Sequence, residues 1–92
     1  MKKAIYKYSF DLKDRQTIVM PEGAEILSVQ TQHEVPCLWA MVAPENKTEI
    51  RLFEVFATGQ IIPCDMGVKR KYIGTFQVQG GHLVFHLFER LT

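Results

Sequence analysis

The sequence predicts a small, mostly antiparallel all-β domain, a sandwich or barrel of six to seven strands. Three observations support this fold class: short runs that alternate polar and apolar residues, turn residues between them at intervals of about eight to twelve positions, and no convincing helical stripe. The chain has 92 residues, of which 47% are hydrophobic. That is enough for one compact core, so we expect residues 1–92 to form a single domain.

The N-terminal third alternates with period two. In residues 4–12, Tyr6, Tyr8 and Phe10 share one face, which is typical of a half-buried strand. A short second strand is predicted at residues 16–20. Pro21 closes it, because proline cannot donate to a β-ladder.

The next two runs differ in polarity. Residues 24–33 predict a strand whose outer half is polar on both faces, as expected of a strand that either projects beyond the core or lies at a sheet edge. After a break at residues 34–36, residues 37–42 are apolar on both faces. They predict a central strand covered on both sides, with Trp39 as the largest side chain of the core.

Residues 48–57 alternate again, with Phe53 on one face and Glu54 and Phe56 on the other. A helix is the alternative, but the β-branched and aromatic content favours a strand. A brief strand at Ile61-Ile62 would be stopped by Pro63. The polar connection from Pro63 to Lys71 is predicted to be the most mobile loop.

The C-terminal quarter predicts a β-hairpin over residues 72–90. Gly80-Gly81 lies between two β-rich runs, and paired glycines suit the positive φ of a tight primed turn. This hairpin is the longest apolar segment and is expected to form a wall of the core. A barrel requires the first and last strands to pair, and no local pattern decides this.

Composition excludes several classes of protein. Eleven Lys and Arg against ten Asp and Glu give a net charge of +1, which provides no strong nucleic-acid signal. No apolar run is long enough to span a membrane, and no signal peptide is recognised. Cys37 and Cys64 form neither a CxxC pair nor a zinc pattern, so we expect free thiols in a reducing cytoplasm.

The residues that could carry chemistry do not form a catalytic constellation. His82 and His86 share a strand face, but at ~3.3 Å per residue their Cα atoms lie about 13 Å apart, too far for one metal ion. Glu54 and Glu89 lie in apolar strands, where a carboxylate must be paired or face solvent. A structural ion pair with Arg51 or Arg90 on a neighbouring strand is favoured over a role as general acid or base. We therefore predict no catalytic residue, metal or cofactor.

Uncharged polar residues are the better candidates for binding. Amides, hydroxyls and imidazoles on a rigid sheet suit a protein interface or a small polar ligand. The candidate binding residues are Gln30, Gln32, His33, Gln77, Gln79, His82 and His86.

Motifs along nearly the whole length resemble a family of short phage- and prophage-encoded proteins of unknown function. The matching segments are residues 3–8, 21–30, 35–40, 58–59, 72–76 and 80–86. One position departs from the family pattern: Gln60 stands where histidine is expected. The resemblance implies a phage context and supplies no catalytic residue.

The sequence thus predicts a non-enzymatic, phage-encoded binding protein in the host bacterial cytoplasm. It would block a host protein, such as a defence component, or sequester a small polar ligand. A structural virion or assembly component is the alternative. A homo-oligomer is left open, because exposed strand edges favour self-association.

Overall fold

The computed structural model describes residues 2–64 and 66–92, which contain seven β-strands. A single 3-10 turn, Gln79–Gly81, follows the sixth strand. The strands are β1 (Ala4–Ser9), β2 (Arg15–Pro21), β3 (Glu25–Gln32), β4 (Val35–Val42), β5 (Thr48–Ala57), β6 (Arg70–Val78) and β7 (Leu83–Arg90).

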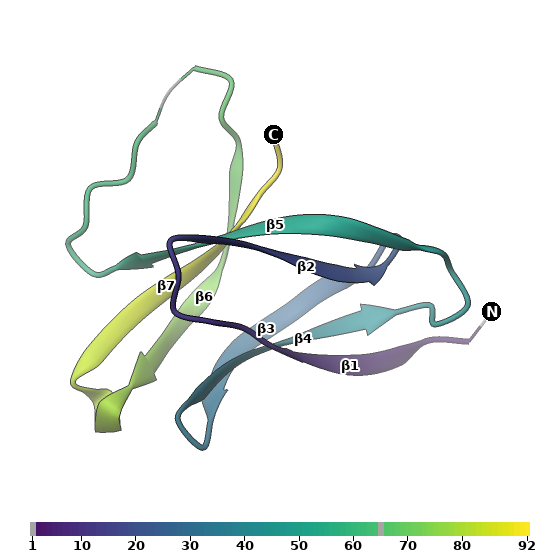
Figure 1. Cartoon of the computed structure of the whole chain (residues 1–92), viewed down its shortest axis with the longest axis horizontal. Coiled ribbons are helices and arrows are strands. Elements are labelled where there is room, and N and C mark those ends of the chain that lie inside the picture. Colours follow the sequence, from purple (N-terminus) through teal and green to yellow (C-terminus); the bar gives the residue numbers. More distant parts are fainter. Residues whose placement is uncertain (1, 65) are drawn as a thin grey trace.

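The strands form two antiparallel sheets, one with the order β1-β4-β3 and the other with the order β2-β5-β7-β6. In Figure 1, β2 and β5 lie above β4 and β1. The all-β prediction and the C-terminal hairpin, β6–β7, are confirmed. Because β1 pairs with β4 while β7 lies between β5 and β6, the first and last strands belong to different sheets. The fold is therefore a sandwich.

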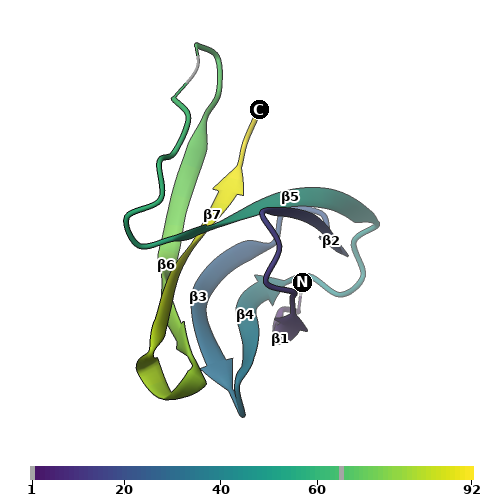
Figure 2. The ribbon, with the colours of Figure 1, turned by 60° about the vertical axis from the view of Figure 1, so that its left-hand side comes forward.

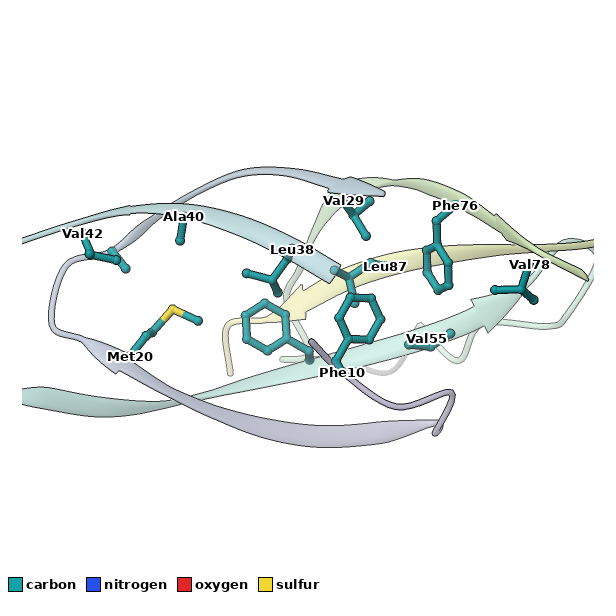
Figure 3. Packing of buried hydrophobic residues seen from close by; sticks show 12 residues of the cluster. Phe10, Met20, Val29, Leu38, Ala40, Val42, Val55, Phe76, Val78 and Leu87 are labelled. Carbon is teal, nitrogen blue, oxygen red and sulfur yellow. The ribbon is translucent and has the colours of Figure 1, made fainter. Parts of the chain in front are cut away.

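The core lies between the two sheets. The three-stranded sheet contributes Leu38, Ala40 and Val42 from β4, and the four-stranded sheet contributes residues such as Val55 and Leu87 (Figure 3). Phe10, on the connection between β1 and β2, packs edge-on against Phe76 with ring centroids 5.5 Å apart. The core residues of β4 occupy alternate positions, as the period of two of a strand requires, whereas residues 53–56 of β5 are buried on both faces.

The edge strands β3 and β6 approach each other closely at one point. A Cβ on Gly74 would lie 2.8 Å from Cγ1 of Val29, which is closer than van der Waals contact allows. Gly74 also follows a shift in the register between β6 and β7. A residue without a side chain at this position therefore lets the two sheets meet along these edges.

Two turns lie side by side at one end of the molecule. The backbone N–H of Gln79, in the β6–β7 turn, donates a hydrogen bond to the carboxylate of Glu34, in the β3–β4 turn. Figures 1 and 2 both show the two turns together. The hairpin turn is wider than the predicted primed turn, because Gln79 joins Gly80 and Gly81 in positive φ, with values of 54°, 65° and 94°.

The prediction for Trp39 is wrong. Strand β4 is central in its sheet, but only one of its faces is covered by the other sheet. Residues Leu38, Ala40 and Val42 point into the core, so Trp39 points to the opposite, outer face and is only half-buried. A continuous apolar run does not distinguish a strand covered twice from one that carries an apolar outer face.

The connection between β5 and β6 differs from the prediction in one respect. Ile61 and Ile62 form no strand, although both lie among the described residues. The end of the connection is anchored, since the Lys69 N–H donates to Thr92 Oγ1 at 2.9 Å and Thr92 Oγ1 donates to the Gly67 carbonyl at 2.7 Å. The mobility of the whole loop stays a prediction.

Candidate ligand-binding groove

A polar groove runs between the edge strands β3 and β6. It has a volume of about 460 Å³ and is lined by Val29, Gln30, Thr31, Thr75, Phe76 and Gln77. Val29 and Phe76 belong to the buried core, and the other four side chains are amides and hydroxyls. The groove can therefore donate and accept hydrogen bonds without any charged lining residue.

Two of the predicted binding residues meet in this groove. Gln30 lies on β3 and Gln77 on β6, and both are exposed. The two strands are not hydrogen-bonded to each other, since each has its pairing partner on the side away from the groove. Each strand therefore turns one unpaired edge toward the groove.

The other predicted residues do not join this pair. Gln32 accepts a hydrogen bond from Lys7 Nζ at 2.7 Å, beyond the groove lining. His33 lies in the β3–β4 turn with φ at 51°. Gln79 begins the β6–β7 turn, and His82 is exposed at its end.

His86 has a structural environment on the outer face of the four-stranded sheet. Its Nε2 is hydrogen-bonded to Thr58 Oγ1 at 2.7 Å, and its Nδ1 to Thr75 Oγ1 at 3.1 Å. The Tyr72 hydroxyl lies 3.3 Å from the same Nδ1. His86 thus ties the end of β5 to β6 and holds Thr75, a lining residue of the groove.

Sequence reasoning missed Thr75. One feature of the sequence could have identified it. Thr75 lies two residues before Gln77 on the same strand, so both side chains share one face of the sheet. Thr31 was part of the polar end of the predicted strand but was not selected. Both threonines became candidates only when the structure brought β3 beside β6.

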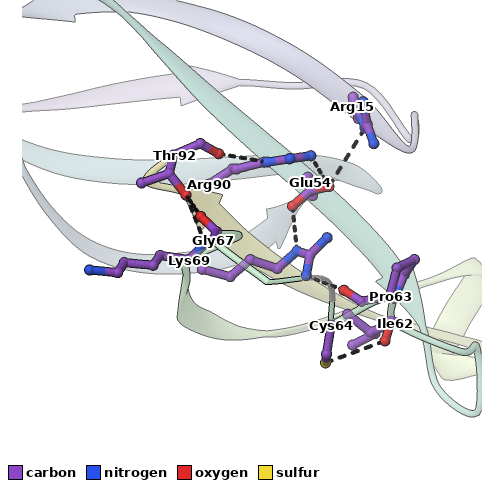
Figure 4. A network of polar contacts seen from close by, with 10 residues as sticks. Arg15, Glu54, Ile62, Pro63, Cys64, Gly67, Lys69, Arg90 and Thr92 are labelled. Atoms are coloured by element: carbon purple, nitrogen blue, oxygen red, sulfur yellow. Dashed lines mark hydrogen bonds and ion pairs between the residues drawn. The ribbon is translucent and has the colours of Figure 1, made fainter.

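The two buried glutamates are neutralised by arginines, as predicted. Arg70 Nε donates to Glu54 Oε1 at 2.6 Å, and Arg15 and Arg90 each lie 3.7 Å from Oε2 (Figure 4). The side chain of Glu54 is 3% exposed and that of Arg70 is 11% exposed. Burial of this carboxylate is tolerated because several cations surround it.

Glu89 has its own arginine. Arg51 Nη2 donates to Glu89 Oε1 at 2.9 Å, Arg51 Nε donates to the other oxygen, and Nη1 donates to the Ala24 carbonyl at 2.7 Å. The hydrogen bond to Glu89 raises the pKa of Arg51 above its ordinary value. The contact between Arg51 and Glu89 is bidentate, and Arg51 links β5, β7 and the residue that precedes β3.

Among the described lining residues, neither glutamate shares its pocket with a histidine. A pocket of about 210 Å³ beside Glu54 is lined by Asp14, Arg15, Glu54, Phe56, Gln60, Ile61, Pro63 and Arg70. The pocket beside Glu89 is lined by residues 50–52 and 89–92. Cys37 is buried and Cys64 is exposed, and both are free thiols.

Residues 2–64 and 66–92 contain no group of three or more His, Cys, Asp or Glu side chains placed to hold a metal ion. The same residues contain no helix with the length and apolar character needed to cross a bilayer.

Comparisons with known proteins give one match. No curated protein and no solved structure is significantly similar to the chain. Residues 1–92 match the model of a family described as a domain of unknown function (DUF7352). Since the match covers the whole chain, the protein belongs to this family.

Proposed function

We propose that the protein is a non-enzymatic binding protein that holds an extended segment of a partner protein in the groove between β3 and β6. The observation that carries this proposal is the meeting of two unpaired strand edges across a groove lined by uncharged polar side chains. Unpaired N–H and C=O groups of edge strands are a common means of binding extended peptides.

The shape of the groove favours a protein segment over a small molecule. Pockets for small ligands are concave and typically enclose 70–90% of the ligand surface. The groove is formed by exposed side chains such as Gln30, Thr75 and Gln77 and is open along its length. A chain that lies along two strands can use such an open surface, because it gains hydrogen bonds at every second residue.

The charged clusters support a non-enzymatic role. Glu54 and Glu89 are held by arginines in structural ion pairs. A general acid or base needs a pKa matched to its task and access to a substrate. Carboxylates held by guanidinium groups, in pockets whose described lining contains no histidine, suit stabilisation of the sheet better than proton transfer.

The resemblance to small phage-encoded proteins suggests the partner. In this proposal the partner is a host bacterial protein, such as a defence component. Binding occurs in the host cytoplasm and blocks the activity of the partner. The alternative of a structural virion or assembly component has its own test, which is detection of the protein in purified particles.

The proposal can be tested with one groove variant and one matched control. Gln77→Lys places a long cation in the groove, whereas Thr17→Lys makes a similar change on β2, the other edge of the same sheet. A partner captured from bacterial lysate with the unmodified protein is identified, and its affinity for each variant is measured by calorimetry.

We expect Gln77→Lys to weaken partner binding by about tenfold or more, the loss of ~1.4 kcal/mol. Thr17→Lys should leave the affinity unchanged. Equal effects of the two changes, or an effect of Thr17→Lys alone, would show that the partner binds elsewhere. Turnover of a substrate by the purified protein would contradict the non-enzymatic role.

A further inference from the structure

The outer face of the three-stranded sheet carries an apolar patch that the rest of the described chain leaves uncovered. We call it the Trp39 face and define it by Ile5 on β1, Leu27 on β3, and Trp39 and Met41 on β4. Ile5 is 57% exposed and Leu27 is 41% exposed. A shallow pocket of about 280 Å³ is lined by Ile5, Leu27, Ser28, Gln30 and Trp39.

The register of the strands places these residues together. Ile5 and Glu25 lie on either side of Met41, and Lys7 and Ser28 lie on either side of Trp39. Directly paired residues share a face of the sheet. Leu27 stands at the register shift between Ile26 and Ser28, and it lines the same pocket as Trp39. An apolar cluster of this kind, with a tryptophan at its centre, is typical of an interaction surface.

The charges on this face are balanced. Strands β1, β3 and β4 contain just two charged residues, Lys7 and Glu25, and the register places both on the outer face. Lys7 Nζ donates a hydrogen bond to Gln32 Oε1, so its ammonium group lies at the C-terminal end of β3. Glu25 is the first residue of β3. The positive and negative groups thus mark opposite ends of the same edge strand.

This arrangement is self-complementary. If a second copy is stacked face to face about a twofold axis that runs across the strands, β3 lies over the β3 of the second copy in the opposite direction. Glu25 then faces the Gln32 end of the second copy, where its Lys7 ammonium lies, and the same contact forms twice. The axis passes between two sets of laterally paired residues. One set is Lys7, Trp39 and Ser28, and the other is Ser9, Cys37 and Gln30. Each indole therefore lies over the paired positions of Ser9, Cys37 and Gln30 in the other copy, where Ser9 and Gln30 are exposed.

We infer that the Trp39 face is an interface between two copies of this chain, which form a symmetric dimer through their three-stranded sheets. An unrelated partner of one charge sign would satisfy either Lys7 or Glu25 and would repel the other. A second copy satisfies both. This inference is argued from the outer face and not from the β3–β6 groove, and Gln30 lines both the groove and the shallow pocket beside Trp39.

The expected dimer is reversible. Three strands at ~4.8 Å spacing and about seven residues at ~3.3 Å rise give a face near 14 Å by 23 Å. Two such faces have a flat area of only ~640 Å² together, below the about 1,000 Å² of total buried surface that is typical of a specific, stable interface. Its formation should therefore depend on protein concentration within the range that sedimentation and light scattering cover.

Charge reversal tests the interface without removing apolar contacts. Lys7→Glu and Glu25→Lys should each weaken the homodimer by about tenfold or more, because each creates two like-charge contacts. An equimolar mixture of the two variants should form a heterodimer, since one face is then wholly acidic and the other wholly basic. Sedimentation velocity of each variant and of the mixture provides the measurement.

Two further readouts assign the dimer to this face. Trp39 is the only tryptophan of the chain, so its fluorescence should shift to shorter wavelength as concentration rises. Trp39→Lys should abolish the dimer, and Ile50→Lys, at a 71% exposed apolar residue on β5, should not. A monomer at every concentration would overturn the inference, as would a dimer that survives Lys7→Glu, Glu25→Lys and Trp39→Lys.

Discussion

Glu54 is a charged residue whose side chain is almost fully buried in a sheet. Three guanidinium groups, those of Arg15, Arg70 and Arg90, surround it. Burial of an unpaired charge costs several kcal/mol, so the group must be neutralised where it lies. In this protein the ion pairs hold together β2, β5, β6 and β7, the four strands of one sheet.

Glu54→Gln should therefore destabilise the fold by about 2–4 kcal/mol, because Arg70 loses its charged partner in a place from which water is largely excluded. Urea unfolding measures the change. Arg15→Gln is the control: the Arg15 side chain is 65% exposed, and its loss should cost no more than about 1 kcal/mol. A Glu54→Gln variant as stable as the unmodified protein would show that the cluster contributes nothing to folding.

The phenol of Tyr8 makes the stability of the folded state depend on pH. Burial raises the pKa of Tyr8 above its ordinary value of 10.0, and the neighbouring Tyr6 raises it further. The folded state thus retains a proton that the unfolded chain releases near pH 10. The resulting stabilisation is complete below pH 10 and is lost as the pH rises through the folded-state pKa.

Tyr8→Phe should remove this part of the pH dependence. Denaturant midpoints compared at pH 8 and above pH 10 should fall less with pH for the variant than for the unmodified protein, because phenylalanine has no proton to release. Identical slopes for the two proteins would contradict the assigned environment of Tyr8.

The sequence predicted the environments of the buried glutamates better than the position of Trp39. A glutamate within an apolar strand has few tolerated environments, so the ion pairs of Glu54 and Glu89 with arginines could be expected. Trp39 was different. Its neighbours are apolar on both sides, and a single sequence does not show which face of a strand receives the second sheet.

At the scale of the elements, the strands follow from alternation and the turns from glycine and proline. The segment 48–57 was predicted with its observed bounds, and its helix alternative is excluded by the structure. The break predicted at residues 34–36 is shorter than expected, because Val35 and Pro36 already belong to β4. Ile61-Ile62 forms no strand, because Pro63 follows at once and leaves no room for a ladder.

Gly74 tests the approach of β3 to β6. Gly74→Ala should destabilise the fold by about 1–3 kcal/mol, because the new methyl group overlaps Cγ1 of Val29. Val29→Ala creates space and should itself cost stability. The loss of unfolding free energy in the double variant should be smaller than the sum of the losses in the two single variants. Urea unfolding of the unmodified protein, the two single variants and the double variant measures these losses. Additive effects would mean that the two strands do not meet at this point.

Two surfaces of the molecule, the β3–β6 groove and the Trp39 face, could not be predicted from the sequence. Both depend on how the two sheets are placed relative to each other. The candidate residues Gln30 and Gln77 are 47 positions apart, and they form one groove because β3 and β6 end up as neighbouring edges of different sheets. No local pattern reports this neighbourhood. The Trp39 face arises in the same way, since the second layer covers only one side of β4.

In the proposed function, the unpaired edges of β3 and β6 bind the partner. The most direct measurement is amide hydrogen exchange of the protein, residue by residue, with and without the captured partner. We predict that slowed exchange on binding concentrates in Val29–Thr31 and Thr75–Gln77, the two walls of the groove. Unchanged exchange in these residues, with protection appearing instead on β2 or in the β5–β6 connection, would contradict the account.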